Sequence, residues 1–205
     1  MEWSELFDRA AEYDRSTAAI ETAIETARND RDGRDRSPNT VDPTPGAERP
    51  TPRPYRIVAD ADVLVFDLLV DGDARRALEA VWRHSWVELL ASDRLIGDAA
   101  TAIGSCTDRR LAEGWRSAID EWRTPVVHPD GDHPALASAY RGGAMHVLTR
   151  DDRLTAAGTG AALRGRFPVS VRDPAAFAAV FDPESLYGEF DDDVYPGPDR
   201  SPRRR

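Results

Sequence analysis

The sequence predicts a three-layer α/β/α domain over residues 55–182, with a central parallel sheet between two layers of helices. Two observations support this fold class. Short apolar segments alternate with amphipathic segments along the whole range, which is typical of parallel sheets that are covered on both faces. Helix-capping residues, prolines and a Gly-Gly pair mark the boundaries between these segments. One such domain and additional terminal segments account for the 205 residues of the chain.

Five segments have the length and the apolar character of strands. They are YRIVADA at 55–61, WVELLA at 86–91, PVVH at 125–128, AMHVLT at 144–149 and FPVSV at 167–171. Segments with apolar side chains at helical spacing lie between these strands and after the last of them. We expect helices at Asp73–His84, at 93–104, at Asp108–Trp122, from Pro134 to the pair Gly142-Gly143, and after the N-cap Asp173. Strands and helices therefore alternate, as a parallel sheet requires.

The segments outside this domain differ from it in composition. Residues 1–28 carry apolar side chains at roughly helical spacing and predict an N-terminal helix. Residues 29–54 contain six prolines and one large aliphatic residue, Val41, so we expect a disordered linker. Residues 183–205 contain three consecutive aspartates and end in three arginines, and we expect this tail to be disordered as well.

Composition limits the classes of function. The net charge of -10 and the absence of lysine are typical of an acidic halophilic proteome and argue against nucleic-acid binding through a broad basic face. The single cysteine, Cys106, excludes a disulfide framework and a cysteine-rich zinc site. No apolar run approaches the roughly 20 residues of a membrane span. No signal peptide is recognisable, so we expect a cytoplasmic location.

Aspartates recur where the expected strands end. They are Asp60 at the end of the first strand and Asp62 directly after it, Asp98 in the helix after the second, Asp130 and Asp132 after the third, and Asp151 after the fourth. Because the carboxyl ends of parallel strands meet at one edge of a sheet, we expect these side chains to lie close together. Clustered carboxylates repel one another, and a hard cation such as Mg²⁺ or Mn²⁺ offsets this repulsion. The sequence therefore predicts a divalent-metal site suited to phosphodiester hydrolysis.

Four segments, taken in order, resemble the PIN-domain ribonucleases, a family that includes the toxins of VapBC systems. The segments are IVADADVLV (57–65), ASDRLIGDA (91–99), DHPALASAYRGGAMHVLTRDDRL (132–154) and FPVSVRDPAAFAAVF (167–181). The resemblance implies a PIN-like fold and an endoribonuclease that uses Mg²⁺ or Mn²⁺ to cleave single-stranded RNA. It assigns catalysis and metal binding to Asp60, Asp98, Asp132 and Asp151, with possible support from Asp62, Thr149 and Asp152.

Several of these assignments have a purely structural alternative. Asp98 stands where the family usually has glutamate, and it could be an ordinary residue of its helix. Asp132 could only cap the helix that starts at Pro134, and Asp130 is its rival for the metal site. Asp151 could only cap the helix that follows it.

Two other functions remain open. Asp98 in place of glutamate, and Met145 where many relatives carry aspartate, fit a PIN-fold interaction module with weakened catalysis. The motif DAD also fits haloacid-dehalogenase phosphatases, with Asp60 as nucleophile and Asp62 as acid and base, but the lysine that this family uses is absent. The N-terminal extension could dock into a groove of its own domain, as an antitoxin segment would, or mediate dimerisation. An antitoxin-like partner or a homodimer is therefore expected besides RNA.

Overall fold

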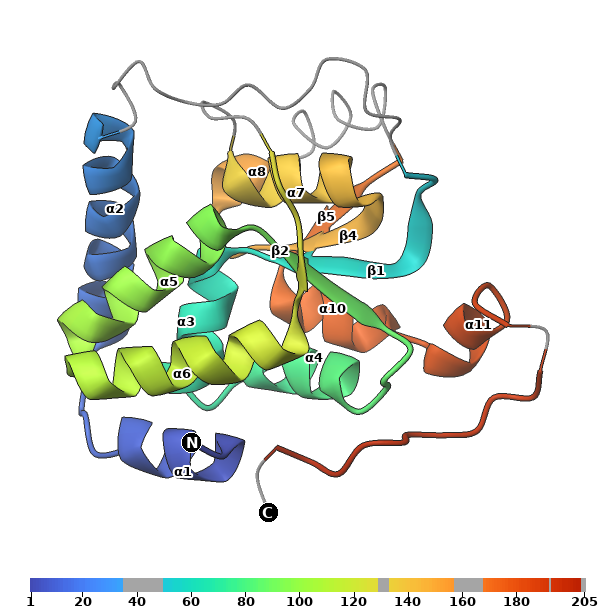
Figure 1. The fold of residues 1–205 in the computed structure, drawn as a ribbon, viewed down its shortest axis with the longest axis horizontal. Helices are drawn as coiled ribbons and strands as arrows, with labels where there is room; N and C mark the ends of the chain where they lie inside the picture. The colour runs from blue at the N-terminus through green and yellow to red at the C-terminus, as the bar shows by residue number, and fades with distance from the viewer. Residues whose placement is uncertain (35–49, 129–132, 157–167, 192, 204–205) are drawn as a thin grey trace.

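A computed structural model describes residues 1–34, 50–128, 133–156, 168–191 and 193–203 of the chain. In these ranges five strands form one parallel sheet in the order β3-β2-β1-β4-β5 (Figure 1). The strands are β1 (Arg53–Ala59), β2 (Glu88–Ala91), β3 (Thr124–Pro125), β4 (Ala144–Leu148) and β5 (Ser170–Arg172). The expected strand at 125–128 is shorter than predicted, and its residue Val127 is 81 % exposed.

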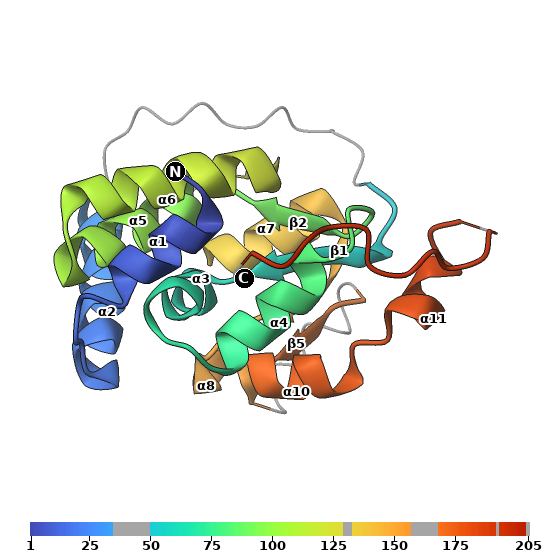
Figure 2. The ribbon, with the colours of Figure 1, turned by 90° about the horizontal axis from the view of Figure 1, so that it is seen from below.

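Helices cover both faces of the sheet, so the predicted three-layer α/β/α class is confirmed (Figures 1 and 2). The helix α7 lies on one face, and α4 and α10 lie on the other, while α5 and α6 pack against each other beside α3. Their bounds are α3 (Ala61–Leu69), α4 (Asp73–Trp82), α5 (Asp93–Cys106), α6 (Arg109–Trp122), α7 (Pro134–Gly142) and α10 (Pro174–Val180). Two short helices, α8 (Asp152–Thr155) and α11 (Pro183–Tyr187), follow β4 and α10. No helix in the described ranges combines the length and the apolar character that crossing a bilayer demands.

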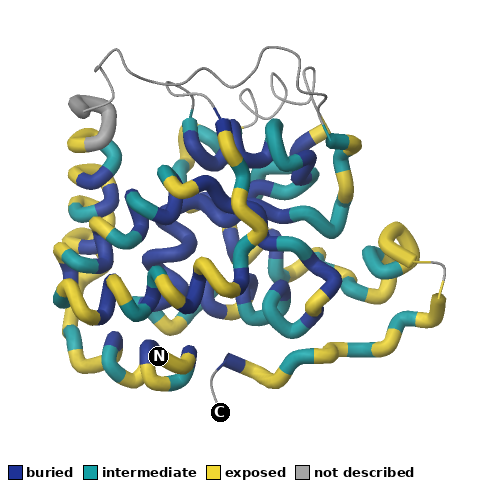
Figure 3. Tube along the Cα trace, in the orientation of Figure 1, coloured by how far each residue is buried: buried dark blue, intermediate teal, exposed yellow. Residues whose placement is uncertain are grey.

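The central strand β1 forms the middle of the core (Figure 3). Ile57, Val58 and Ala59 are fully buried, because helices or neighbouring strands surround this strand on every side. Ile57 lies opposite Leu89 of β2 and His146 of β4. This register brings the carboxyl ends of β1 and β4 to the same edge of the sheet.

The helix α3 was not predicted, because the sequence YRIVADA suggested a strand that continued through Ala61. The chain instead turns at Asp60, whose side chain caps α3 by accepting a hydrogen bond from the backbone N–H of Ala61 at 2.7 Å. Every residue from Ala61 to Leu68 is buried. A helix that is buried all round has no polar face, so its sequence lacks the amphipathic pattern that identifies most helices.

The expected single helix over residues 1–28 is wrong, because the structure has two helices there, α1 (Trp3–Ala10) and α2 (Thr17–Arg34). The helix α1 packs against α3 and α6, whereas α2 packs against α3 and α5. The helix α2 also extends into the expected linker, and residues 35–49 of that linker lie outside the described residues. Both helices bury apolar side chains against the domain, as Leu6 and Ile20 do.

The expected disordered tail at 183–205 is also wrong for the residues that the structure describes. After α11 the chain runs back along the domain as an extended segment and reaches α1 (Figures 1 and 2). The side chain of Arg203 is fully buried and donates two hydrogen bonds to Asp67, at 2.8 and 2.9 Å. A charged residue enters the core here because a buried carboxylate neutralises it.

Candidate acidic site at the carboxyl edge of the sheet

Two buried aspartates lie where β1 passes into α3. Asp60 is 2 % exposed and Asp62 is 6 % exposed. One oxygen of each carboxylate is held locally, since Asp60 Oδ1 accepts from the backbone of Ala61 and Asp62 Oδ1 accepts from the backbone of Val63, at 2.7 and 2.6 Å. The N-terminus of a helix attracts negative charge, so α3 stabilises both carboxylates. Their other oxygens, Oδ2, point away from these local contacts and toward β4 and α2.

Residues that directly follow β4 supply polar partners for the two Oδ2 atoms. Thr149 is fully buried, and its hydroxyl lies 3.0 Å from Asp60 Oδ2 and 3.2 Å from Asp62 Oδ2. A hydroxyl has one proton, so it donates to one of these oxygens at a time. The backbone N–H of Arg150 donates to Asp62 Oδ2 at 3.1 Å, and that of Asp151 donates to the Thr149 hydroxyl at 3.1 Å. The structure therefore brings Asp60, Asp62, Thr149 and Asp151 together.

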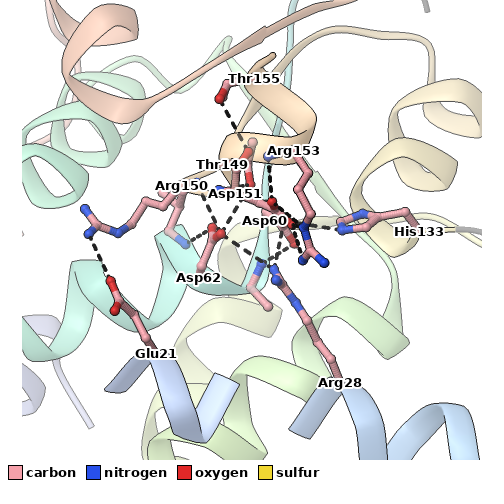
Figure 4. Close-up of polar contacts among 12 residues, drawn as sticks. Glu21, Arg28, Asp60, Asp62, His133, Thr149, Arg150, Asp151, Arg153 and Thr155 are labelled. Carbon is pink, nitrogen blue, oxygen red and sulfur yellow. Dashed lines mark hydrogen bonds and ion pairs between the residues drawn. The ribbon is translucent and has the colours of Figure 1, made fainter. Parts of the chain in front are cut away.

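An arginine from α2 enters this acidic cluster, and it was not among the residues predicted from the sequence. Arg28 Nη2 lies 2.9 Å from Asp60 Oδ2 and 3.6 Å from Asp62 Oδ2 (Figure 4). Burial alone would lower the pKa of Arg28, but the charges of Asp60, Asp62 and Asp151 outweigh it and raise that pKa. A sequence signal was present, because Arg28 continues the helical spacing of Ile24 in a helix that was already expected.

The single positive charge of Arg28 does not neutralise the charges of both Asp60 and Asp62. Burial, and then the neighbouring charge of Asp60, raise the pKa of Asp62 to about 7, although Arg28 and two backbone N–H groups oppose the shift. Asp151 behaves in the opposite way, because hydrogen bonds from the Arg153 side chain lower its pKa. At neutral pH the site thus holds ionised Asp151 and a carboxyl group, Asp62, that is close to its titration midpoint.

A pocket of about 320 Å³ opens between α2 and the end of β4. Acidic, basic and two apolar side chains line it: Glu21, Ile24, Glu25, Arg28, Asp62, Phe66, Arg150, Asp151, Asp152 and Arg153. Arg150 lies over the ring of Phe66, 3.9 Å from its centroid, and is 3.7 Å from Glu21. The pocket thus offers carboxylates to a metal ion and guanidinium groups to a phosphate.

The remaining residues predicted for the site have different positions. Asp98 is buried, 6 % exposed, in α5, a helix that packs against both α2 and α3. Asp152 is exposed at the rim of the pocket. Asp132 and its rival Asp130 lie outside the described residues. His133, which was not predicted for the site, places its Nε2 3.8 Å from Asp60 Oδ2.

The carboxylates of Asp60 and Asp62 fit a hard cation on the condition that Arg28 first moves away. Two carboxylate oxygens converge on the nitrogen of Arg28, and such oxygens are the ligands that Mg²⁺ and Mn²⁺ prefer. A metal ion in this position would repel the guanidinium, so Arg28 has to withdraw first. Among the described residues no group of three or more His, Cys, Asp or Glu side chains has the arrangement of a metal site.

Residues 51–203 match the model of a family of unknown function, DUF7384. No curated protein and no solved structure matches the chain. The matched range starts just before β1 and ends at the buried Arg203, so it includes both acidic strand ends and leaves out α1 and α2 with Arg28. Since the match covers more than half of the sequence, this chain belongs to the DUF7384 family.

Proposed function

We propose that the domain is a Mg²⁺- or Mn²⁺-dependent phosphodiesterase that cleaves RNA. The observation that carries the proposal is the convergence of Asp60 Oδ2 and Asp62 Oδ2 on a single cationic atom at the carboxyl edge of a parallel sheet. Ligands of open α/β folds bind at this edge. Keeping two carboxylates buried side by side costs free energy, as the raised pKa of Asp62 indicates, and a bound divalent ion would offset that cost.

The residues present would have distinct roles in such a site. Asp60 and Asp62 would hold the ion, and Asp151, which stays ionised, lines the same pocket. The bound ion would supply an acidified water molecule and stabilise negative charge on the phosphoryl oxygens. Thr149 holds both Oδ2 atoms in place by hydrogen bonding, and the backbone N–H of Arg150 also holds that of Asp62. Ligation by Asp98 and Asp132 is carried over from the resemblance to PIN-domain ribonucleases.

RNA is the proposed substrate because of that same resemblance, and local charge supports it. The chain as a whole carries a net charge of -10, which repels a polyanion. Arg150 and Arg153 nevertheless line the pocket beside the carboxylates, and the side chain of Arg153 is 83 % exposed. These guanidinium groups can contact a phosphate, while the net negative charge of the chain disfavours a long polyanion, which favours a short single-stranded segment over an extended duplex.

Cleavage of a labelled single-stranded RNA tests the proposal. The full chain and its Arg28→Ala variant are each incubated with Mn²⁺, and cleavage is expected from at least the variant. The same reaction with Asp60→Asn added should lose activity at least about 100-fold, whereas Asp120→Asn on the exposed side of α6 should not. Absence of Mn²⁺-dependent cleavage by both the full chain and Arg28→Ala would contradict the proposed activity.

One observation favours a second candidate, a binding module without catalysis. The acidic pair already accepts a protein guanidinium, that of Arg28. A site that recognises arginine could serve to hold a segment of the chain or of a partner in place. Metal separates the two candidates, because a module of this kind should show no thermal shift with Mn²⁺ and no cleavage even when Arg28 is removed.

A further inference from the structure

We infer that α2 is a built-in inhibitor of the acidic site: Arg28 and a divalent cation compete for Asp60 and Asp62, and α2 must leave the pocket before the ion binds. This inference rests on the proposed metal site and concerns its regulation. Arg28 Nη2 lies within 3.6 Å of both Oδ2 atoms, so the guanidinium occupies the position that a shared ion would need.

The contact between α2 and the pocket is complementary in charge at three positions, not only at Arg28. Arg28 faces the carboxylates, whereas Glu21 lies 3.7 Å from the guanidinium of Arg150. Glu25 also lines the pocket and interacts electrostatically with Arg153. Figure 4 shows Glu21 and Arg28 pointing from the same helix toward the cluster. The helix places glutamates opposite the arginines of the pocket and an arginine opposite its aspartates, so the charges of the helix are complementary to those of this pocket.

The rest of the contact suits a segment that can leave. The buried apolar side chains of α2 are Ile20, Ile24 and Ala27, and every other side chain described in this helix is exposed or half-buried. The neighbouring α1, in contrast, buries Trp3 and Phe7 and can keep the N-terminus attached. The family match also begins only at residue 51, so α2 is an addition to the part of the chain that defines the family.

Competition of this kind has a measurable consequence. The apparent affinity for a cation equals the intrinsic affinity multiplied by the fraction of molecules in which the site is free. Removing Arg28 should therefore strengthen binding. We expect Arg28→Ala to lower the dissociation constant for Mn²⁺ at least about tenfold, measured on the full chain from the EPR signal of free Mn²⁺.

A matched control and a dependence on the acidic pair complete this experiment. Arg9→Ala removes another N-terminal arginine in an ion pair, with Asp108, at a similar side-chain exposure of 23 % compared with 18 % for Arg28. It should leave Mn²⁺ affinity unchanged within about twofold. Adding Asp60→Asn to Arg28→Ala should abolish the gain in affinity. If Arg28→Ala binds Mn²⁺ no more tightly than the unmodified chain, the inference is overturned.

A second variant guards against misfolding of Arg28→Ala and leaves the acidic pair untouched. Glu21→Gln combined with Glu25→Gln weakens the docking of α2 through its other two charged contacts. We expect a two- to threefold gain in Mn²⁺ affinity, since exposed ion pairs are weak. No gain in this variant, with its circular dichroism unchanged, counts against the inference.

Cleavage assays on the same proteins separate the inference from the proposed activity. Tighter Mn²⁺ binding by Arg28→Ala without any RNA cleavage would contradict the nuclease activity and support the competition between Arg28 and the cation. Equal Mn²⁺ affinity together with equal Mn²⁺-dependent cleavage by Arg28→Ala and the unmodified chain would overturn the competition and support the nuclease. If both proposals are correct, Arg28→Ala should bind more tightly and cleave faster at a Mn²⁺ concentration that does not saturate the unmodified chain.

Discussion

Two arginines, Arg203 and Arg28, attach the two terminal segments to buried aspartates, and the comparison between them separates a structural contact from a functional one. Arg203 meets Asp67 through two nitrogens, at 2.8 and 2.9 Å, and Glu79 through a third, at 3.1 Å. Arg75 adds a second guanidinium 3.4 Å from Asp67. Two cations thus face two anions, with complete burial of Arg203.

Arg28 forms a much less complete contact. It approaches Asp60 at 2.9 Å and Asp62 at 3.6 Å, both through the same nitrogen, and its side chain is 18 % exposed. The pKa of Asp62 rises to about 7 because burial and Asp60 outweigh this cation. A pocket opens beside the pair, whereas aromatic rings of Trp3, Phe7 and Trp122 surround Arg203. The C-terminal contact is balanced in charge and its guanidinium is completely buried, whereas the acidic site is unbalanced in charge and its guanidinium is partly exposed.

The largest expected effect concerns the balanced contact. Arg203→Ala leaves Asp67 buried with one partner fewer, and breaking a buried ion pair in this way costs about 3–5 kcal/mol. Urea unfolding followed by circular dichroism measures the change in free energy. Arg109→Ala, in an exposed helical ion pair with Glu113, is the control and should change stability by less than about 0.5 kcal/mol. A loss below about 1 kcal/mol in Arg203→Ala would remove the distinction between the two contacts.

The second prediction uses the imbalance at Asp62. Its pKa is about 7 in the folded protein and close to 4 in an unfolded chain, so the folded state binds an extra proton between these values. Stability from this group is present below pH 4 and is lost as the pH rises toward 7. Asp62→Asn mimics the protonated form and should be more stable than the unmodified chain at pH 8 by at least about 1 kcal/mol.

The stability of each protein is compared between two pH values, because groups far from Asp62 titrate in the same way in both proteins. Urea midpoints at pH 5 and pH 8 should differ less for Asp62→Asn than for the unmodified chain. If the variant is less stable at pH 8, or the two proteins lose the same stability between the two pH values, Asp62 does not carry unbalanced charge. Added Mn²⁺ should raise the midpoint of the unmodified chain at pH 8 and not that of Asp62→Asn.

The third prediction concerns the hydroxyl between the two carboxylates. Thr149→Val keeps the shape of a fully buried side chain but removes the donor to Asp60 and Asp62. The loss of one hydrogen bond to a charged group should destabilise the protein by about 1.5–3 kcal/mol at pH 8. Thr155→Val, at a half-buried threonine whose hydroxyl donates to the carbonyls of Asp151 and Asp152 at 3.4 and 3.3 Å, is the control. Equal losses in the two variants would show that the hydroxyl has no special role.

Much of the fold follows from local pattern in the sequence. The alternation of short apolar segments with amphipathic helices predicted the parallel sheet, and the end of each strand predicted where Asp60, Asp62 and Asp151 would lie. Such positions are predictable because strand direction alone sends carboxyl ends to one edge. The helix α3 was missed for the opposite reason, since its complete burial removes the periodicity that marks a helix.

The partners of the two arginines could not be predicted from local pattern. Arg203 belongs to a run of charged residues that resembles a solvated tail, and its burial depends on Asp67, which lies far from it in the sequence. Arg28 looks like a surface residue at the end of a thin apolar stripe until α2 is placed beside β4. In both cases a tertiary ion pair decides whether a charged side chain is exposed or buried.

The position of Mn²⁺ in a crystal tests the central claim most directly. Crystals of Arg28→Ala grown with Mn²⁺ should show an anomalous scattering peak in contact with both Asp60 Oδ2 and Asp62 Oδ2, in the position that Arg28 Nη2 holds in the unmodified chain. Substitution of Asp60 by Asn in the same background should remove the peak. Ordered Asp60 and Asp62 side chains with no anomalous peak between them, at a saturating Mn²⁺ concentration, would contradict the claim that this edge of the sheet is a divalent-metal site.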